Sequence, residues 1–310
     1  MAVNEKIRPL ENRVRIAGTL TSLSEKREGV TQDGVPYISF SGKVACDEAG
    51  IVEVNFRTFE RAKLKNGTDS KNYPAVVKWY NDARPKETNP DNPTMVTIAG
   101  SLTDNPFVNK DGELVEGYQY NLKFFSEFKE YQAQVDIEGF IYSLIEEVRG
   151  EDEVPTGRMR MRLISMDGFG NVLSLNSIVI PSDFVDALDD AGWEKGATIR
   201  AAIDIMPSEK PKAVKTAAFG RQHVVNNRIY KELVVTGGDN AYDPDGERAI
   251  TTEQVKAMLA ERKMKLDEVQ KAGYLGHSTS STNVARGSLG NKKTTVPNNF
   301  SIDDEEDYPF

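Results

Sequence analysis

The stretch Val14-Arg15-Ile16-Ala17-Gly18-Thr19-Leu20-Thr21-Ser22-Leu23 recurs further along the chain as Val135-Asp136-Ile137-Glu138-Gly139-Phe140-Ile141-Tyr142-Ser143-Leu144. Valine, isoleucine, glycine, serine and leucine keep the same spacing in both copies. Each copy opens a strand-rich segment of similar length, which indicates an internal duplication. Gly18 and Gly139 stand in the two predicted first strands, where a small barrel needs a residue without Cβ in order to bend.

The same order of predicted elements follows each copy. Apolar spacing predicts a helix over 73–80 in the first half and over 182–191 in the second. Alternating apolar and polar residues predict strands over 37–45, 51–59, 95–102 and 118–128, and again over 158–165, 172–180, 198–205 and 212–235, the last with an internal turn. Ser182 and Asp183 supply capping chemistry for the second helix, and Pro181 ends the strand before it.

Five strands with a helix between the third and fourth are typical of the oligonucleotide-binding (OB) fold, a small Greek-key barrel. The sequence therefore predicts an all-β protein of two tandem OB-fold barrels with a short C-terminal helical segment and a disordered acidic tail. Two all-β domains of another kind are the alternative. The predicted segments are barrel one over 1–130, barrel two over 131–240, a helical segment over 241–275, a flexible linker over 276–300 and the tail over 301–310.

The helical segment has its own start signal. Thr251 stands three residues before Gln254, a capping-box pattern that opens an amphipathic stretch. We expect this stretch to form one helix, or two short helices that break near Met264. Serine, threonine, asparagine and glycine dominate from Gly276 on, which predicts a flexible linker because there is little to bury.

Composition excludes several classes of protein. The chain has 310 residues and a net charge of −9, and no apolar run approaches the roughly 18 residues of a membrane span. No secretory signal is visible, so we expect a cytoplasmic protein that binds no membrane. One cysteine, Cys46, excludes an internal disulfide framework, and two histidines with one cysteine cannot supply the four ligands of a structural zinc. Only carboxylate metal sites stay open, and we expect neither a metal nor a cofactor.

Catalytic motifs are missing from the sequence. It has no Walker loop, dinucleotide-binding glycine fingerprint, HExxH motif or nucleophile elbow. His223 and His277 are far apart, so a paired general base is not expected. We therefore predict a protein that is not an enzyme.

Strand parity in the first barrel places an aromatic and basic set of side chains on its outer face. Aromatic rings stack on bases while Lys and Arg offset phosphate charge, without reading sequence. The residues of this face that we expect to bind nucleic acid are Tyr37, Lys43, Asn55, Arg57, Phe59 and Arg61. The loop between the fourth and fifth strands adds Phe107 and Lys110, ahead of a hairpin turn at Asp111-Gly112. Ordinary exposure of scattered aromatic residues is the alternative.

The second barrel carries basic residues at two places. Its second predicted strand places three arginines on one face: Arg158, Arg160 and Arg162. Like charges in a row repel unless an anion or an acidic partner meets them. The segment 210–231 has six bases and no acid, and those we expect to bind nucleic acid are Lys212, Lys215 and Arg221. The alternative pairs these bases with the acids of 151–153 or 186–190.

The last ten residues combine five acids with an aromatic end. An apolar side chain presented together with the α-carboxylate can be captured by one small pocket lined by bases. The residues expected to dock a partner are Asp303, Asp304, Glu305, Glu306, Asp307, Tyr308, Pro309 and Phe310.

This layout resembles bacterial and bacteriophage single-stranded DNA-binding proteins, in which OB folds bind DNA and a disordered acidic tail ending in Pro-Phe docks replication and repair partners. The similarity covers residues 10–238 through strand order and 301–310 through the tail. An aliphatic residue usually precedes the terminal Pro-Phe of the bacterial pattern, whereas Tyr308 stands here. Two barrels in one chain are closer to some phage versions than to the one-barrel bacterial subunit.

The resemblance implies a protein that coats single-stranded DNA without sequence preference during replication, recombination and repair. It also implies that the tail recruits replication or recombination proteins, in the cytoplasm of a bacterial host if a phage encodes the chain. Two other functions fit the sequence. A duplicated-barrel structural or assembly protein would bind protein and not DNA, and a recombination mediator would load a recombinase through the helical stretch 251–272. The sequence makes no prediction of the oligomeric state.

Overall fold

The computed structural model describes residues 7–64, 66–149, 153–208, 214–215, 223–224 and 231–280. The first barrel, barrel 1, contains β1 (Asn12–Leu23), β2 (Arg27–Val30), β3 (Pro36–Ala45), β4 (Glu53–Arg61), α1 (Asn72–Asp82), β5 (Met95–Asp104) and β8 (Tyr118–Glu127). The second, barrel 2, contains β9 (Gln132–Arg149), β10 (Val154–Met166), β11 (Val172–Ile180), α2 (Ser182–Val185), α3 (Ala187–Asp190), β12 (Thr198–Pro207) and β15 (Lys231–Gly238). The remaining elements are β6 (Phe107–Val108), β7 (Leu114–Val115), β13 (Val214–Lys215), β14 (His223–Val224) and α4 (Thr252–Ser280).

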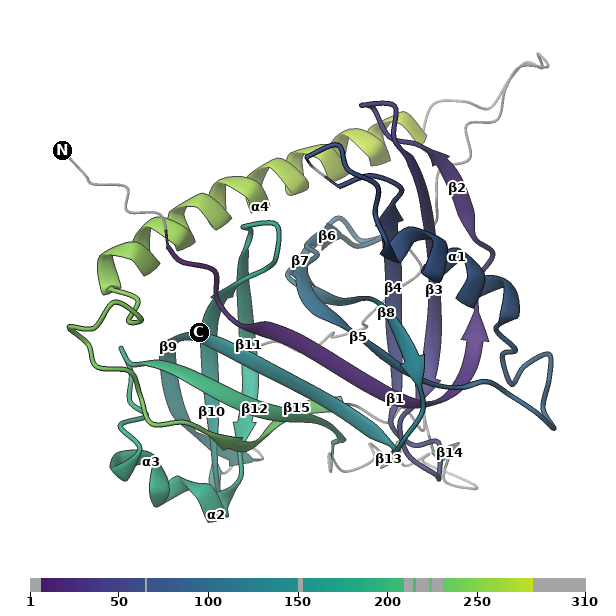
Figure 1. The fold of residues 1–310 in the computed structure, drawn as a ribbon. Coiled ribbons are helices and arrows are strands. Elements are labelled where there is room, and N and C mark those ends of the chain that lie inside the picture. The colour runs from purple at the N-terminus through teal and green to yellow at the C-terminus, as the bar shows by residue number, and fades with distance from the viewer. Residues whose placement is uncertain are drawn as a thin grey trace. The chain divides into compact units, whose positions relative to one another are not determined.

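Strand pairing closes both halves of the chain in the same way (Figure 1). In barrel 1, β1 pairs with β3 and β5, β3 pairs with β4, β5 pairs with β8, and a parallel bridge joins β4 to β8. In barrel 2, β9 pairs with β10 and β12, β10 with β11, β12 with β15, and β11 runs parallel to β15. In barrel 1 the helix α1 lies between β4 and β5, and in barrel 2 the helices α2 and α3 lie between β11 and β12. Apart from the short strand β2, the two barrels therefore share one order, with the helical segment between the third and fourth strands. The predicted pair of OB-fold barrels is confirmed.

The two repeated glycines lie where strands approach one another closely. A Cβ added to Gly18 would come within 1.8 Å of the carbonyl oxygen of Ala45, and one added to Gly139 within 2.7 Å of the carbonyl oxygen of Ile164. Both distances are shorter than van der Waals contact. β1 therefore needs glycine where β3 crosses it, and β9 needs glycine where β10 crosses it.

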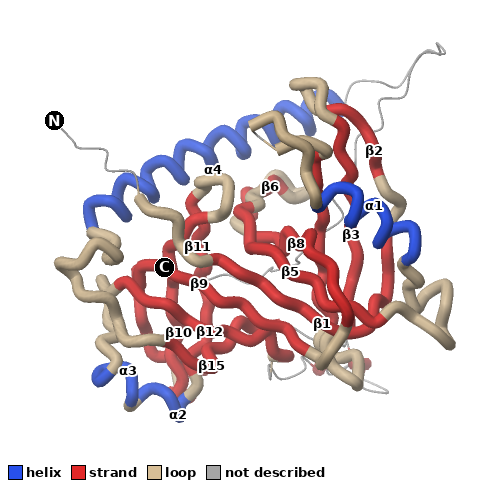
Figure 2. Tube along the Cα trace, in the orientation of Figure 1, coloured by secondary structure: helices blue, strands red, loops and turns tan. Residues whose placement is uncertain are grey.

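One antiparallel pairing joins the barrels into a continuous sheet, whose strands are red in Figure 2. β1 pairs with β9, and Val14 lies opposite Val135, its counterpart in the repeat. Equivalent residues facing each other across an antiparallel pair place a local pseudo-two-fold axis at this point. The duplication is therefore visible in space as well as in sequence.

Internal contacts divide the chain into two compact units. One holds both barrels and extends to Glu261, and the other contains Asn105–Gly117 and the part of α4 from Arg262 onward. Within the first unit, the segment that starts α4 packs on barrel 2 through a small apolar cluster of Phe140, Ile164, Val172, Ile250, Val255 and Met258. Within the second, Arg262 forms an ion pair of 3.0 Å with Glu116. No helix in the described part of the chain is long and apolar enough to cross a membrane.

The predicted capping box of α4 is confirmed. The backbone N–H of Thr251 donates to Oε1 of Gln254 at 2.8 Å, and the N–H of Gln254 donates to Oγ1 of Thr251 at 3.2 Å. The helix is continuous through Met264 and is described to Ser280, so its last residues overlap the segment 276–300 that the sequence predicts as a linker. A single glycine costs a helix only about 1 kcal/mol relative to alanine and does not by itself end it.

The predicted helix over 182–191 is wrong in detail, because the structure has two short helices, α2 and α3. Pro181 is the N-cap residue of α2, and no side chain caps that helix. Ser182 and Asp183 are already inside its first turn, past the position from which a side chain caps a helix. Pro181 does follow the end of β11, as predicted.

Candidate nucleic-acid interface

The outer surface of β2, β3 and β4, here called face 1, carries side chains in rows. Tyr37 lies opposite Gly29 on one side and Arg61 on the other. Opposed residues of antiparallel strands share a face, as do alternate residues along each strand. The rows that follow Tyr37 are Arg27, Ser39 and Phe59, then Ser41 and Arg57, then Lys43 and Asn55.

Burial confirms the predicted parity of β3 and β4. The intervening residues point into barrel 1, and Ile38, Val54 and Phe56 are almost completely buried. Tyr37 and Phe59 are half-buried on the outside, and Arg57 is exposed. The structure therefore brings together the six residues predicted from these two strands.

Tyr37 and Phe59 form a pair of rings in the first two rows of face 1. They are diagonal neighbours on adjacent strands, with ring centroids 5.3 Å apart and ring planes tilted by 32°. Diagonal cross-strand positions are within reach of aromatic side chains. Two adjacent rings at a sheet surface provide a platform on which flat, unpaired bases can stack.

Two cations of face 1 are partly neutralised by nearby acids. Arg61 forms an ion pair with Asp33, which also accepts a hydrogen bond of 2.5 Å from the Thr31 hydroxyl. These two contacts, that of Thr31 first, hold the pKa of Asp33 below its usual value. Lys43 lies 3.4 Å from Glu53. Both pairs are largely open to solvent, so an approaching phosphate can compete for either cation.

Arg27 and Arg57 differ from these two cations. Both side chains are exposed, and neither forms an ion pair with any residue that the structure describes. Arg57 lies one row beyond Phe59, and Arg27 lies in the same row as Phe59. The arginines of face 1 that have no described acidic partner are therefore next to the ring pair.

Arg27 and Gly29 were not among the residues predicted from the sequence, because β2 was not predicted. The segment is short and lacks the alternation of a half-buried strand. A usable signal was present in the Asp33-Gly34 dipeptide, which is typical of a hairpin turn between two strands. Gly34 has φ of +79°, as such a turn requires.

Phe107 and Lys110 lie on the β6–β7 hairpin, which belongs to the second compact unit. The predicted turn is present: the N–H of Gly112 donates to the carbonyl oxygen of Asn109 at 3.1 Å, and Gly112 has φ of +86°. Lys110 is exposed and Phe107 is half-buried within this unit.

Barrel 2 uses two of its three predicted arginines in an ion-pair cluster, here defined as Arg158, Arg160, Glu147 and Glu232. Arg158 lies 2.9 Å from Glu147 and 2.8 Å from Glu232, and Arg160 contacts both acids, with 2.9 Å to Glu232. The acids are 11% exposed and the arginines 19% and 20%. The described acidic partners of these two arginines thus come from β9 and β15, whereas the sequence proposed the acids of 151–153 and 186–190. Residues 151 and 152 lie outside the described part of the chain.

Electrostatics within the ion-pair cluster favours the charged forms. Burial alone would lower the pKa of Arg160, but its hydrogen bonds to Glu147 and Glu232 raise it. Burial likewise opposes ionisation of Glu232, yet Arg158 and Arg160 lower its pKa. Two positive and two negative groups leave the cluster with no net charge.

Arg162, the third arginine of β10, has neutral partners. Its guanidinium lies 4.8 Å from the ring centroid of Tyr142, and its Nε donates to the Ser174 hydroxyl at 3.2 Å. Several predicted site residues fall outside the part of the chain that is described: Lys212, Arg221 and 303–310, together with the side chain of Lys215.

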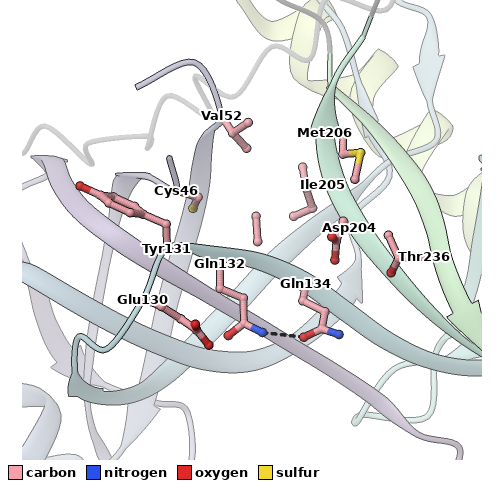
Figure 3. A pocket seen from close by; sticks show the side chains of 11 residues that line it. Cys46, Val52, Glu130, Tyr131, Gln132, Gln134, Asp204, Ile205, Met206 and Thr236 are labelled. Atoms are coloured by element: carbon pink, nitrogen blue, oxygen red, sulfur yellow. Dashed lines mark hydrogen bonds between the residues drawn. The ribbon is translucent and has the colours of Figure 1, made fainter. Parts of the chain in front are cut away.

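A groove of about 380 Å³ lies beside the pairing of the two barrels (Figure 3). Gln132 donates to Gln134 at 2.6 Å on its floor, and Cys46 and Asp204 also line it. Burial raises the pKa of Cys46 to about 12, so its thiol stays neutral. Among the described residues, no three His, Cys, Asp or Glu side chains gather closely enough to hold a metal ion. The groove contains none of the predicted binding residues.

A family model described as YorF matches residues 11–272. Among solved structures, the chain is similar to the wild-type single-stranded DNA binding protein from Thermus aquaticus, with 14% identity and a TM-score of 0.45 over 77% of this chain and 97% of that one. It is also similar to a deletion mutant of the Thermus aquaticus protein, with 14% identity and a TM-score of 0.43 over 77% and 99% of the two chains. None of the curated proteins matches the chain. The strand pairings, and not these similarities, establish the fold.

Proposed function

The chain belongs to the YorF family, and we propose that it binds single-stranded DNA, without sequence preference, on face 1 of barrel 1. One observation carries this proposal: the Tyr37–Phe59 ring pair lies beside two exposed arginines, Arg27 and Arg57, that have no ion pair with a described residue. Stacking of a base on an aromatic ring contributes about 1–3 kcal/mol and tolerates any base. Arginines beside the rings offset phosphate charge.

The dimensions of face 1 suit a short single strand. Its four rows from Tyr37 to Lys43 span about 20 Å, because alternate residues of a strand are separated by about 6.8 Å. That length accommodates a few nucleotides, in keeping with the roughly 4–16 nucleotides that one OB fold covers. Bases stacked inside a duplex cannot reach the rings, so face 1 should prefer unpaired strands.

The role of such a protein is to coat single-stranded DNA during replication, recombination or repair in the cytoplasm. The acidic stretch 303–310 serves this role by docking replication or recombination proteins. Its composition supports this part of the proposal: five acids precede Tyr308-Pro309-Phe310, which suits a basic pocket with an apolar floor. A pull-down of replication proteins with the full chain and with a chain lacking 301–310 tests it, and equal recovery by both would reject it.

The DNA-binding proposal is tested by fluorescence anisotropy of a labelled oligo-dT across a salt series, with duplex DNA as competitor. Each phosphate that is neutralised contributes about −0.7 to the slope of log K against log salt. Two unpaired arginines therefore predict a slope of about −1.4 or steeper. Unlabelled duplex of the same length should compete poorly. No binding at low salt, or equal competition by duplex, would overturn the proposal and leave a duplicated barrel that binds protein.

A further inference from the structure

Gly29 lies beneath the ring of Tyr37. A Cβ added to this glycine would stand 3.0 Å from Oη of Tyr37 and 3.1 Å from its Cε1 and Cζ atoms. The outer half of the ring therefore covers the α-carbon of Gly29. These distances are shorter than ordinary van der Waals contact, so the ring would have to move by a few tenths of an ångström for a methyl group and further for a branched side chain.

Backbone conformation does not require glycine at this position. Gly29 has no positive φ, in contrast to Gly34 in the turn of the same hairpin. Glycine within a strand is unfavourable, because it loses more conformational freedom on folding than other residues and packs nothing. Glycine at this position leaves room above the α-carbon, and the ring of Tyr37 fills that room.

We propose that Gly29 is a positioning residue for base stacking on face 1. Its missing side chain lets the Tyr37 ring lie down across β2 while it contacts Phe59. A side chain at position 29 would push the ring up and away, and only Phe59 would remain as a stacking surface. This inference rests on the proposed function, since it explains how one half of the ring platform is held.

The test compares three variants with the wild-type chain: Gly29→Val, Tyr37→Ala and the double variant. Gly237→Val is the matched control, because Gly237 also lies in a strand, has no positive φ, and has no atom within 4 Å of an added Cβ. Binding is measured for oligo-dT and for an abasic oligomer of equal length. Binding of the abasic oligomer reports phosphate contacts alone. The difference in binding free energy between oligo-dT and the abasic oligomer reports base stacking.

Gly29→Val should weaken binding of oligo-dT by roughly five- to 150-fold, the range for loss of one stacked base, and should leave abasic binding and the salt slope unchanged. When Tyr37→Ala is already present, Gly29→Val should cause little further loss of oligo-dT affinity. Gly237→Val should bind as the wild type does. Thermal unfolding of each variant checks that it is folded.

Two results would overturn the positioning role while the wild type still binds: Gly29→Val binds oligo-dT as tightly as wild type, or it loses abasic binding to the same extent. A wild-type chain with no preference for oligo-dT over the abasic oligomer would overturn stacking itself, and with it the proposed function.

Discussion

The outer faces of the two barrels differ although their five shared strands pair in the same order. The bridge that closes barrel 1 joins Arg57 to Asn121, and the equivalent parallel pairing in barrel 2 joins Val179 to Val234. Arg57 is exposed, whereas Val179 is 1% exposed and lies opposite Arg160. One position thus carries an exposed arginine in barrel 1, without an ion pair to any described residue, and a buried apolar side chain in barrel 2.

The same fold therefore supports two uses of charge. In barrel 1 the arginines next to the rings have no ion pair with a described residue, while in barrel 2 the arginines and acids of the ion-pair cluster neutralise one another. A self-neutralised cluster holds strands together but offers little to a phosphate. The proposed function therefore uses face 1 of barrel 1, and the ion-pair cluster is expected to stabilise barrel 2.

Arg160→Ala gives the largest expected effect, and it is on stability. Removing Arg160 leaves Glu147 and Glu232 with one cation between them in a largely buried place, which should lower the free energy of unfolding by about 3 kcal/mol. Binding of oligo-dT by the folded fraction should stay unchanged. Urea unfolding followed by circular dichroism measures the loss. Arg162→Ala is the matched control on the same strand and should cost less than about 1 kcal/mol, because its partners are neutral. Equal losses would contradict the cluster's role.

Glu138→Gln should also lower the stability of barrel 2. Glu138 is 3% exposed and accepts hydrogen bonds from Arg8, Arg248 and Tyr242, whereas barrel 1 has Ala17 at the same place in the repeat. Burial alone would raise the pKa of Glu138, but the hydrogen bonds, that of Arg8 first, lower it to about 2. Loss of the charge should reduce the free energy of unfolding by about 2 kcal/mol at neutral pH.

The pH dependence of this loss follows from the lowered pKa. A carboxyl whose folded pKa lies below its unfolded value stabilises the fold above the unfolded value, and the contribution is lost as pH falls towards the folded value. The gap between Glu138→Gln and wild type should therefore close between pH 4.5 and about 2, since 4.5 is the ordinary pKa of the side chain. Urea unfolding at a series of pH values measures it, and a gap that does not change with pH would contradict the prediction.

Phe59→Ala should act on binding in barrel 1. Loss of one ring of the platform should weaken binding of oligo-dT by about 1–3 kcal/mol and leave the salt slope as it is. The control is Phe169→Ala in barrel 2, which removes a ring that is 64% exposed and should not change affinity. A matching loss in both variants would show that stacking is not confined to face 1.

Much of barrel 1 could be predicted because its signals are local. The alternation of 37–45 and 51–59 decides which side chains point inward, and parity alone then groups Tyr37, Arg57 and Phe59 on one face. The closeness of Tyr37 and Phe59 needed the strand register, which alternation does not give. β2 was missed because a short edge strand with little apolar content carries no such pattern.

The sequence alone could not show which groups pair with the arginines of barrel 2, because their partners are far away along the chain. Glu147 is 13 residues from Arg160, and Glu232 is 72 residues from it. A row of like charges indicates that a counter-charge must exist, but not whether it comes from DNA or from the chain itself. In the folded chain the counter-charge comes from Glu147 and Glu232, on the first and fifth strands of the same barrel.

Arg57→Ala should have almost no effect on stability and a small effect on the salt dependence of binding. Because Arg57 has no ion pair with a described residue, its removal should change the free energy of unfolding by no more than about 0.5 kcal/mol, in contrast to Arg160→Ala. The salt slope of oligo-dT binding should become shallower by about 0.7, the contribution of one phosphate contact to a single strand, and by the same amount for every base composition. Arg84→Ala, in the loop after α1 and outside the β2–β4 sheet, is the control and should leave the slope unchanged. An unchanged slope in Arg57→Ala would mean that the exposed cation at the closing bridge does not touch phosphate, and face 1 would then bind through its rings and its paired cations alone.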